Sequence, residues 1–165
     1  LIFILVNNKK MKDEFNIYLK NIESTKGLAL KFSKIISKSI LICLDGELGT
    51  GKTTFARFLI NFLAKKEIKV LSPTFPIVQI YDLAKLKVWH FDLYRIRNKN
   101  ELFNLDFEIA LNDLVIVEWS KIIKDFLPQN RIEMFFYEDK DLQKYVKIKF
   151  FGNANLKKFS ENEIK

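Results

Sequence analysis

Uninterrupted apolar runs occur at residues 40–44 and 114–117 of the chain. Runs of this length and composition are typical of strands that are buried on both faces of a parallel sheet. Apolar residues at helical spacing predict two amphipathic helices, one capped by Ser24 or Thr25 and one beginning near Gly51. Their apolar positions are Leu28, Phe32, Ile35 and Ile36 in the first helix, and Phe55, Phe58, Leu59, Phe62 and Leu63 in the second.

Weaker patterns complete the expected set of elements. Alternating or apolar segments predict further strands at 15–22, 69–71, 77–83, 86–91, 131–137 and 145–151, with the third and fourth paired and the last two at a sheet edge. Helical stretches are expected at 101–111, after a cap at Asn98 or Asn100, and at 122–126, before Pro128. Strands that alternate with helices indicate an α/β fold with a mostly parallel central sheet covered on both faces.

The chain of 165 residues is long enough for one core and too short for two. We therefore expect a single domain at 11–152, an N-terminal extension at 1–10 that precedes Met11, and a polar C-terminal tail at 153–165. The apolar run at 1–6 is too short to cross a membrane. A cytoplasmic protein without a membrane anchor is the expectation.

Composition changes this picture only in part. Apolar residues make up 48% of the chain and charged residues 29%, which excludes a disordered chain. The net charge of +8 invites a nucleic-acid partner, but the 28 basic residues include only four arginines, and the lysines are scattered. Direct nucleic-acid binding therefore stays an alternative to the main interpretation. The single cysteine, Cys43, lies within an apolar strand and is expected to be a core residue.

The strongest chemical signal follows the first apolar run. The segment at 46–53 reads Gly-Glu-Leu-Gly-Thr-Gly-Lys-Thr and fits the phosphate-loop pattern between a strand and a helix. Three of the chain's five glycines lie in this loop, where they permit tight turns and let backbone amides face an anion. We expect ATP and Mg²⁺ here, in a P-loop NTPase-like three-layer sandwich with antiparallel edge strands. The binding residues are Gly46, Glu47, Leu48, Gly49, Thr50, Gly51, Lys52, Thr53 and Thr54, with Lys52 on the phosphates and Thr53 on the metal.

Two acidic residues end apolar strands, and a phosphate-loop enzyme needs a carboxylate near its metal. Glu118 follows the run at 114–117, and Asp92 ends the segment at 88–91. We expect both to be catalytic and to lie at the metal, although either charge alone could be a solvated strand end. The sole histidine, His90, alternates with aromatic residues, which favours a packing role over catalysis.

Two further positions were candidates for nucleotide contacts. Trp119 directly follows Glu118 and could either join the core or cover the nucleotide. The segment 72–75 ends a predicted strand, and its hydroxyls, including that of Thr74, could sense a γ-phosphate as a switch does. A simple turn around Pro73 is the alternative.

Four segments in this order and spacing resemble the TsaE family, formerly called YjeE. They are GELGTGKTTF at 46–55, SPTFPIVQIY at 72–81, HFDLYRI at 90–96 and VEWS at 117–120. The resemblance extends from about residue 15 to 150, and the last two segments are far more specific than the phosphate loop.

The resemblance implies an ATPase required for threonylcarbamoyladenosine at the adenosine beside the anticodon of tRNAs that read codons beginning with A. In that family the protein acts with TsaB and TsaD, after TsaC makes threonylcarbamoyl-adenylate, and meets tRNA only indirectly through the complex. Hydrolysis is expected to reset the assembly between turnovers. Lys52 and Thr53 would hold phosphate and Mg²⁺, Asp92 and Glu118 would form the acidic pair, and Trp119 would lie near the nucleotide.

The chain departs from the family pattern at three positions, and none of them is a metal-site residue. Glu47 replaces Asp, Pro76 replaces a hydrogen-bonding residue and removes a backbone donor, and Lys121 replaces an acidic residue. A small-molecule or nucleotide kinase is the rival enzyme class. Kinases usually close an arginine-bearing lid over the phosphoryl group, whereas this chain has only Arg57, Arg95, Arg97 and Arg131 and shows no lid insertion.

Overall fold

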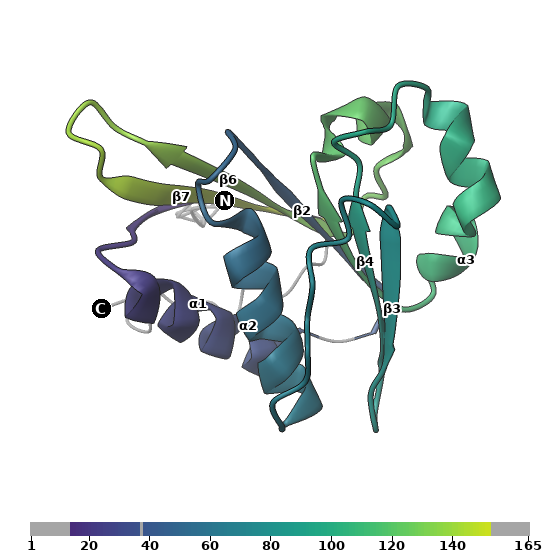
Figure 1. The fold of residues 1–165 in the computed structure, drawn as a ribbon, viewed down its shortest axis with the longest axis horizontal. Coiled ribbons are helices and arrows are strands. Elements are labelled where there is room, and N and C mark those ends of the chain that lie inside the picture. Colours follow the sequence, from purple (N-terminus) through teal and green to yellow (C-terminus); the bar gives the residue numbers. More distant parts are fainter. Residues whose placement is uncertain (1–13, 37, 153–165) are drawn as a thin grey trace, which may run out of the picture.

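The computed structural model describes residues 14–36 and 38–152. The described residues form a seven-stranded sheet with helices on both faces, which confirms the α/β prediction (Figure 1). In chain order the elements are β1 (Glu14–Tyr18), α1 (Ile22–Ile35), β2 (Ile40–Gly46), α2 (Lys52–Ala64), β3 (Val78–Asp82), β4 (Lys87–Asp92), η1 (Lys99–Leu105), α3 (Phe107–Ala110), β5 (Leu114–Glu118), η2 (Ser120–Phe126), β6 (Arg131–Glu138) and β7 (Lys144–Phe151), where η denotes a 3₁₀ helix.

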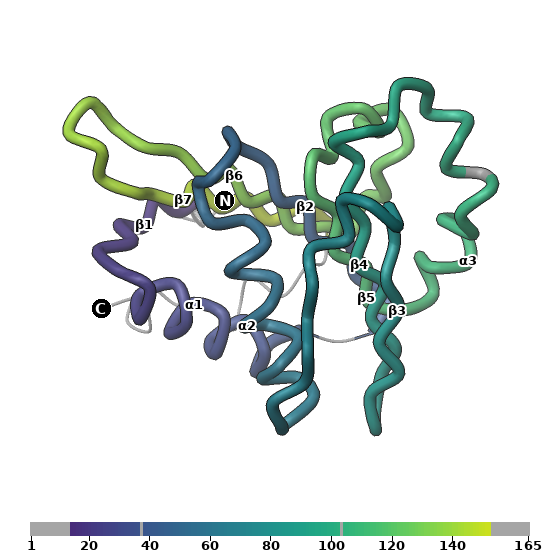
Figure 2. Tube along the Cα trace, in the orientation of Figure 1, coloured from purple at the N-terminus to yellow at the C-terminus, as the bar shows by residue number. Residues whose placement is uncertain are grey.

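The strand order of the sheet is β1-β7-β6-β2-β5-β4-β3. The four central strands β6, β2, β5 and β4 are mutually parallel, while β7, β1 and β3 pair antiparallel at the two sides. The prediction of a mostly parallel centre with antiparallel edges is therefore confirmed. The placement of β6 and β7 at the edge is wrong, because β1 pairs with β7 and itself forms that edge (Figure 2).

Two apolar clusters, one on each face of the sheet, make the three layers. Helices α1 and α2 cover one face, where Phe32, Phe55 and Leu59 are fully buried against the strands. On the other face, η1, α3 and η2 cover strands β2, β5 and β4 through residues such as Phe107 and Ile123. Burial of both faces explains the uninterrupted apolar sequence of β2 and β5.

Several local predictions need correction. Helix α1 is capped by Asn21, whose side-chain Oδ1 accepts from the Ser24 amide at 3.0 Å, and not by Ser24 or Thr25. This earlier cap also ends β1 at Tyr18, before the predicted residue 22. The predicted helix at 101–111 is divided into η1 and α3 by Asp106, which has a φ of 54°. Its cap is Asn98, one of the two predicted candidates.

The predicted strand at 69–71 does not form. Side chains of α2 bind the backbone of this segment instead, because Arg57 Nε donates to the Val70 carbonyl at 3.1 Å and Asn61 Oδ1 accepts from the Ile68 amide at 2.7 Å. These contacts satisfy polar backbone groups that a neighbouring strand would otherwise have to pair.

Other sequence predictions concern single features. Cys43 is fully buried in β2, as expected, and burial raises the pKa of its thiol to about 12. Among the described residues no helix is long and apolar enough to cross a membrane. The expected extension at 1–10 and the tail at 153–165 lie outside the described part of the chain.

Candidate nucleotide-binding site

The loop between β2 and α2 owes its shape to glycine. Gly46 has a φ of 134°, and a Cβ at this position would lie 2.0 Å from the Phe136 carbonyl oxygen, so no other residue fits. Gly51 is the N-cap of α2 with a φ of 109°. Because the first amides of a helix have no intrahelical partner, the start of α2 presents donors and a positive dipole end to the loop.

The Lys52 side chain folds back against this loop. Its Nζ donates to the carbonyl oxygens of Gly46 at 2.8 Å and Glu47 at 2.7 Å, and it lies 4.1 Å from the centre of the Trp119 ring. Burial lowers the pKa of Lys52, while the nearby Glu118 carboxylate opposes this shift. A buried cation held by neutral acceptors and a ring face is a strong site for an anion.

Glu118 connects three elements at the end of β5. Its Oε2 accepts from the Thr53 hydroxyl of α2 at 2.8 Å, and its Oε1 lies 2.9 Å from His90 Nε2 of β4. Glu118 and His90 are both almost completely buried. Buried carboxylates require such partners, and these two fix the position of both oxygens. The other ring nitrogen of His90, Nδ1, has no hydrogen-bond partner among the described residues.

Asp92 lies beside Glu118, because β4 and β5 are parallel and these residues are direct partners in the register. Its Oδ2 accepts from the Thr74 hydroxyl at 2.5 Å, and its Oδ1 accepts from the Tyr94 amide at 2.9 Å. The Ser72 and Thr74 hydroxyls also lie 2.8 Å apart. The segment 72–75, for which the sequence leaves a switch and a simple turn open, is thus attached directly to the second carboxylate.

Trp119 forms one wall of the site. Its backbone has a φ of 62°, which is rare for a bulky residue, and its amide donates to the Leu44 carbonyl at 3.0 Å. This conformation directs the chain away from β5 and leaves the ring half-buried over Lys52 and 5.0 Å from the Tyr94 ring. Trp119 therefore packs against the core, as one of the two alternatives predicted, and its ring also lies beside Lys52 of the loop.

Ten of the thirteen predicted site residues line one hollow of about 290 Å³. The lining residues are Leu48, Gly49, Gly51, Lys52, Thr53, Thr54, Ser72, Thr74, Asp92, Tyr94, Glu118 and Trp119. The other three predicted residues are not in this lining. Gly46 and Glu47 supply the carbonyls to which Lys52 donates, and the Thr50 hydroxyl donates to the Glu47 carbonyl at 2.8 Å. Sequence reasoning gave His90 a packing role and did not single out Tyr94, although both belong to the HFDLYRI segment.

A second hollow of about 420 Å³ lies on the other side of the loop. It shares Gly49, Gly51 and Thr54 with the first and adds Thr50 and residues from the start of α1 and the β6–β7 turn, among them Asn21 and Lys144. The Lys144 Nζ donates to the Gly49 carbonyl at 3.1 Å. No motif pointed to these residues, because they are distant in sequence from the loop.

The oxygen groups of the site fit Mg²⁺ bound together with phosphate. No described group of three His, Cys, Asp or Glu residues could hold a metal ion by itself. Mg²⁺ usually takes only one or two protein carboxylates and completes its octahedron with phosphate oxygens and water. Thr53, Glu118 and Asp92 supply this limited set of hard oxygen donors.

Comparisons with known proteins identify the family of this chain. The family model described as "Threonylcarbamoyl adenosine biosynthesis protein TsaE" matches residues 19–146. The protein named "tRNA threonylcarbamoyladenosine biosynthesis protein TsaE" from Rickettsia prowazekii is 39% identical over 117 residues, which are 70% of this chain and 81% of the relative. The protein of the same name from Bacillus subtilis is 32% identical over 133 residues, covering 81% and 84% of the two chains.

A solved structure is also similar. The crystal structure of YdiB from Bacillus subtilis superposes with a TM-score of 0.65 at 26% sequence identity, covering 85% of this chain and 87% of YdiB. The family model spans the loop, both carboxylates and Trp119. This chain belongs to the TsaE family.

Proposed function

We propose that this protein binds ATP with Mg²⁺ at the loop 46–54 and hydrolyses it in the service of tRNA threonylcarbamoyladenosine biosynthesis. The process is the one for which its family and relatives are named. The hydrolytic part rests on one observation: the Thr53 hydroxyl and the carboxylates of Glu118 and Asp92 meet in a single hollow facing Lys52.

Lys52 would bind the β- and γ-phosphates. Its ammonium already has a position between the Gly46 and Glu47 carbonyls and the Trp119 ring, so little rearrangement is needed to reach an anion in the hollow. Bonds from an ammonium to charged phosphate oxygens are stronger than bonds to neutral carbonyls. The amides at the start of α2 would share the phosphate charge.

Thr53, Glu118 and Asp92 would hold the metal and the attacking water. A bound Mg²⁺ neutralises charge on the β- and γ-oxygens. Glu118 is fixed through both oxygens and Asp92 through both of its own, so the two carboxylates are positioned before the nucleotide arrives. Pre-positioned charges of this kind contribute most to phosphoryl transfer, since the protein forms no covalent bond to the phosphoryl group.

The second hollow would accommodate the nucleoside. It adjoins the first hollow, because the two share residues of the loop. A nucleotide could therefore place its phosphates in the first hollow and its base in the second. Backbone and side-chain groups of Asn21 and Lys144 border it. We assign adenine and ribose to this side of the loop.

Hydrolysis would change a protein-binding surface. Thr74 joins the segment 72–75 to Asp92, so loss of the γ-phosphate or metal at Asp92 would release that segment. Phe75 at its tip is 83% exposed and contacts only the Arg95 guanidinium, 5.1 Å from its ring centre, among the ring interactions described. We propose that this surface binds the TsaB–TsaD complex in the ATP state and that tRNA is reached through that complex.

A kinase reaction has less support. None of the residues that line the first hollow is an arginine. Of the four arginines, Arg57 binds the Val70 carbonyl, Arg95 lies over Phe75 and Arg131 pairs with Glu133. A kinase would place such groups around the transferred phosphoryl.

The substitution Lys52→Ala tests nucleotide binding. We expect the affinity for a nonhydrolysable ATP analogue to fall about a hundredfold, because one buried ammonium contributes about 3 kcal/mol to a charged acceptor. Isothermal titration calorimetry with Mg²⁺ measures it, and Lys34→Ala on the exposed side of α1 is the control for loss of charge. Equal affinity in the wild type and Lys52→Ala would exclude this loop as the site.

A further inference from the structure

Half of one sheet face is uncovered. On β6 and β7 every second residue is buried toward α1 and α2, while the alternate residues are exposed or half-buried. The short helices that cover the other strands on this side pack on β2, β5 and β4. We call the surface formed by the outward residues of β6, β7 and β1 the open face; no described helix lies over it.

A row of aromatic rings crosses the open face. Phe135 stacks on Tyr137 with ring centres 6.1 Å apart, Tyr137 stacks on Tyr145 at 5.5 Å, and Tyr145 contacts Tyr18 of β1 at 5.2 Å. The two ends of the row are the more exposed, with Phe135 at 41% and Tyr18 at 45%. Exposed rings in a row on a sheet are unusual for a solvated face, where polar side chains would cost nothing.

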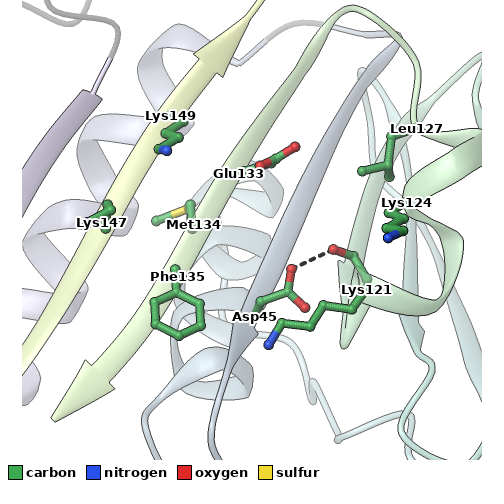
Figure 3. A pocket seen from close by; sticks show the side chains of 10 residues that line it. Asp45, Lys121, Lys124, Leu127, Glu133, Met134, Phe135, Lys147 and Lys149 are labelled. Atoms are coloured by element: carbon green, nitrogen blue, oxygen red, sulfur yellow. Dashed lines mark hydrogen bonds between the residues drawn. The ribbon is translucent and has the colours of Figure 1, made fainter.

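Lysines lie around one end of this row. A hollow of about 330 Å³ opens beside Phe135, with Lys147 and Lys149 of β7 on one side and Lys121 and Lys124 of η2 on the other (Figure 3). The acidic groups in its lining are Asp45 and Glu133, so four cations against two anions leave a net charge of +2. Glu133 is itself paired with Arg131 at 2.7 Å.

The ion pairs of these lysines neutralise only part of this positive charge. Glu14 at the sheet edge lies 3.5 Å from the Lys147 Nζ and 3.0 Å from the Lys149 Nζ, but one carboxylate neutralises only one of the two lysines. Lys121, a departure from the family pattern, lies 5.6 Å from the centre of the Phe135 ring. Asp45 accepts from the Ser120 hydroxyl through Oδ2, while its buried Oδ1 has no partner among the described residues.

We propose that the open face and this hollow bind single-stranded RNA directly, in addition to the route to tRNA through the TsaB–TsaD complex, with bases on the ring row and phosphates on the lysines. Exposed rings with cations beside them are the groups by which proteins stack unpaired bases and hold their backbone. An acidic protein segment is the rival occupant, and the row of rings beside four lysines favours unpaired bases with their phosphates. Only the choice of RNA over DNA rests on the family's place in tRNA modification.

The test is a fluorescence anisotropy titration with a labelled, mixed-sequence single-stranded RNA oligonucleotide. Lys147→Gln combined with Lys149→Gln should weaken binding about tenfold at low salt and reduce the slope of log affinity against log salt by about 1.4, or about 0.7 for each lysine. The matched control removes the same charge from α1, on the covered side, with Lys26→Gln and Lys34→Gln. This control should bind as the wild type does.

Stacking has its own variants. Phe135→Ala should also weaken binding about tenfold, because it removes one stacking platform, whereas Phe135→Tyr should retain it. The same RNA annealed into a duplex should bind more weakly than the single strand. Thermal denaturation of each variant shows whether it is folded.

Three results would overturn the proposal: no RNA binding by the wild type, equal losses in the two lysine double variants, or no loss in Phe135→Ala. The first would leave an acidic protein as the occupant, and the second would mean general attraction by a basic chain. None of the substituted residues Phe135, Lys147 and Lys149 lines either hollow of the proposed nucleotide site. Titration of the same proteins with the ATP analogue therefore separates this failure from failure of the ATPase proposal.

Discussion

Glu118 is the residue through which the parts of the proposed nucleotide site are connected. Thr53 reaches it from α2, His90 from β4, and Asp92 lies opposite it in the register. A carboxylate that is 1% exposed and holds two hydrogen bonds cannot turn toward solvent without leaving buried partners unpaired. Its charge is therefore fixed in direction, as a metal- or water-orienting group requires.

Replacing this charge should separate binding from hydrolysis. Glu118→Gln keeps the shape and an acceptor for Thr53, so the ATP analogue should still bind within a fewfold of the wild type. Hydrolysis should fall about a hundredfold or more, since charge and positioning carry phosphoryl transfer. Calorimetry and a phosphate-release assay measure the two effects, and Asp92→Asn should also lose hydrolysis. Near-normal turnover in both variants would make these residues ordinary strand-end charges.

His90 should act through Glu118 as a positioning residue. His90→Ala removes the partner of Glu118 Oε1, and the loss of one hydrogen bond to a charged group should lower kcat about tenfold. The KM for ATP should change little. His90→Gln offers an amide donor at a similar distance and should recover part of kcat. If kcat and KM change together in both variants, or if Gln rescues nothing, the histidine has only a packing role.

For single residues, the sequence predicts which residues lie at the candidate site better than it predicts the contacts between them. The loop spacing and the two strand-end acids select eight residues that line one hollow, and the segments that follow two strand ends add Thr74 and Trp119. The alternation of Trp89, His90 and Phe91 correctly indicates burial of the histidine, which is 0% exposed. Its bond to Glu118 joins residues 28 apart in sequence, and no periodicity contains that information.

Among the elements, α1 carries a cap whose contribution to stability can be measured in the absence of nucleotide. Asn21 Oδ1 accepts from both the Ser24 amide and the Ser24 hydroxyl. Asn21→Ala should lower the free energy of unfolding by about 1 kcal/mol, and Asn21→Ser should restore most of it, because serine caps equally well. Chemical denaturation measures both. Equal stability of all three proteins would mean that the first turn of α1 does not depend on this cap.

Elements with strong periodicity were predicted well, and those fixed by tertiary contacts were not. The apolar runs of β2 and β5 and the stripe of α2 follow from burial alone. The segment 69–71 has a strand-like composition, yet side chains of α2 bind the Val70 carbonyl within it and the Ile68 amide just before it. The edge position of β1 likewise depends on its pairing with β7, more than a hundred residues along the chain.

For the whole molecule, the parallel centre of the sheet explains why the site lies where it does. The carboxyl ends of β2, β4 and β5 meet at one edge, which brings the loop, Asp92 and Glu118 together although they are widely separated in sequence. The segment 72–75 joins the same edge through Thr74. The open face is formed by β6, β7 and β1, so the fold has room for the proposed nucleotide site and for the proposed RNA-binding surface.

The central claim is that ATP hydrolysis at this site sustains tRNA modification. The most direct measurement follows incorporation of labelled threonine into tRNA by TsaC, TsaB and TsaD with bicarbonate and ATP, in the presence of either this protein or its Glu118→Gln variant. Release of the complex by a nucleotide-driven switch predicts repeated turnover with the wild type and arrest after a single round with the variant. If Glu118→Gln supports as many rounds as the wild type, hydrolysis at this site does not serve the modification.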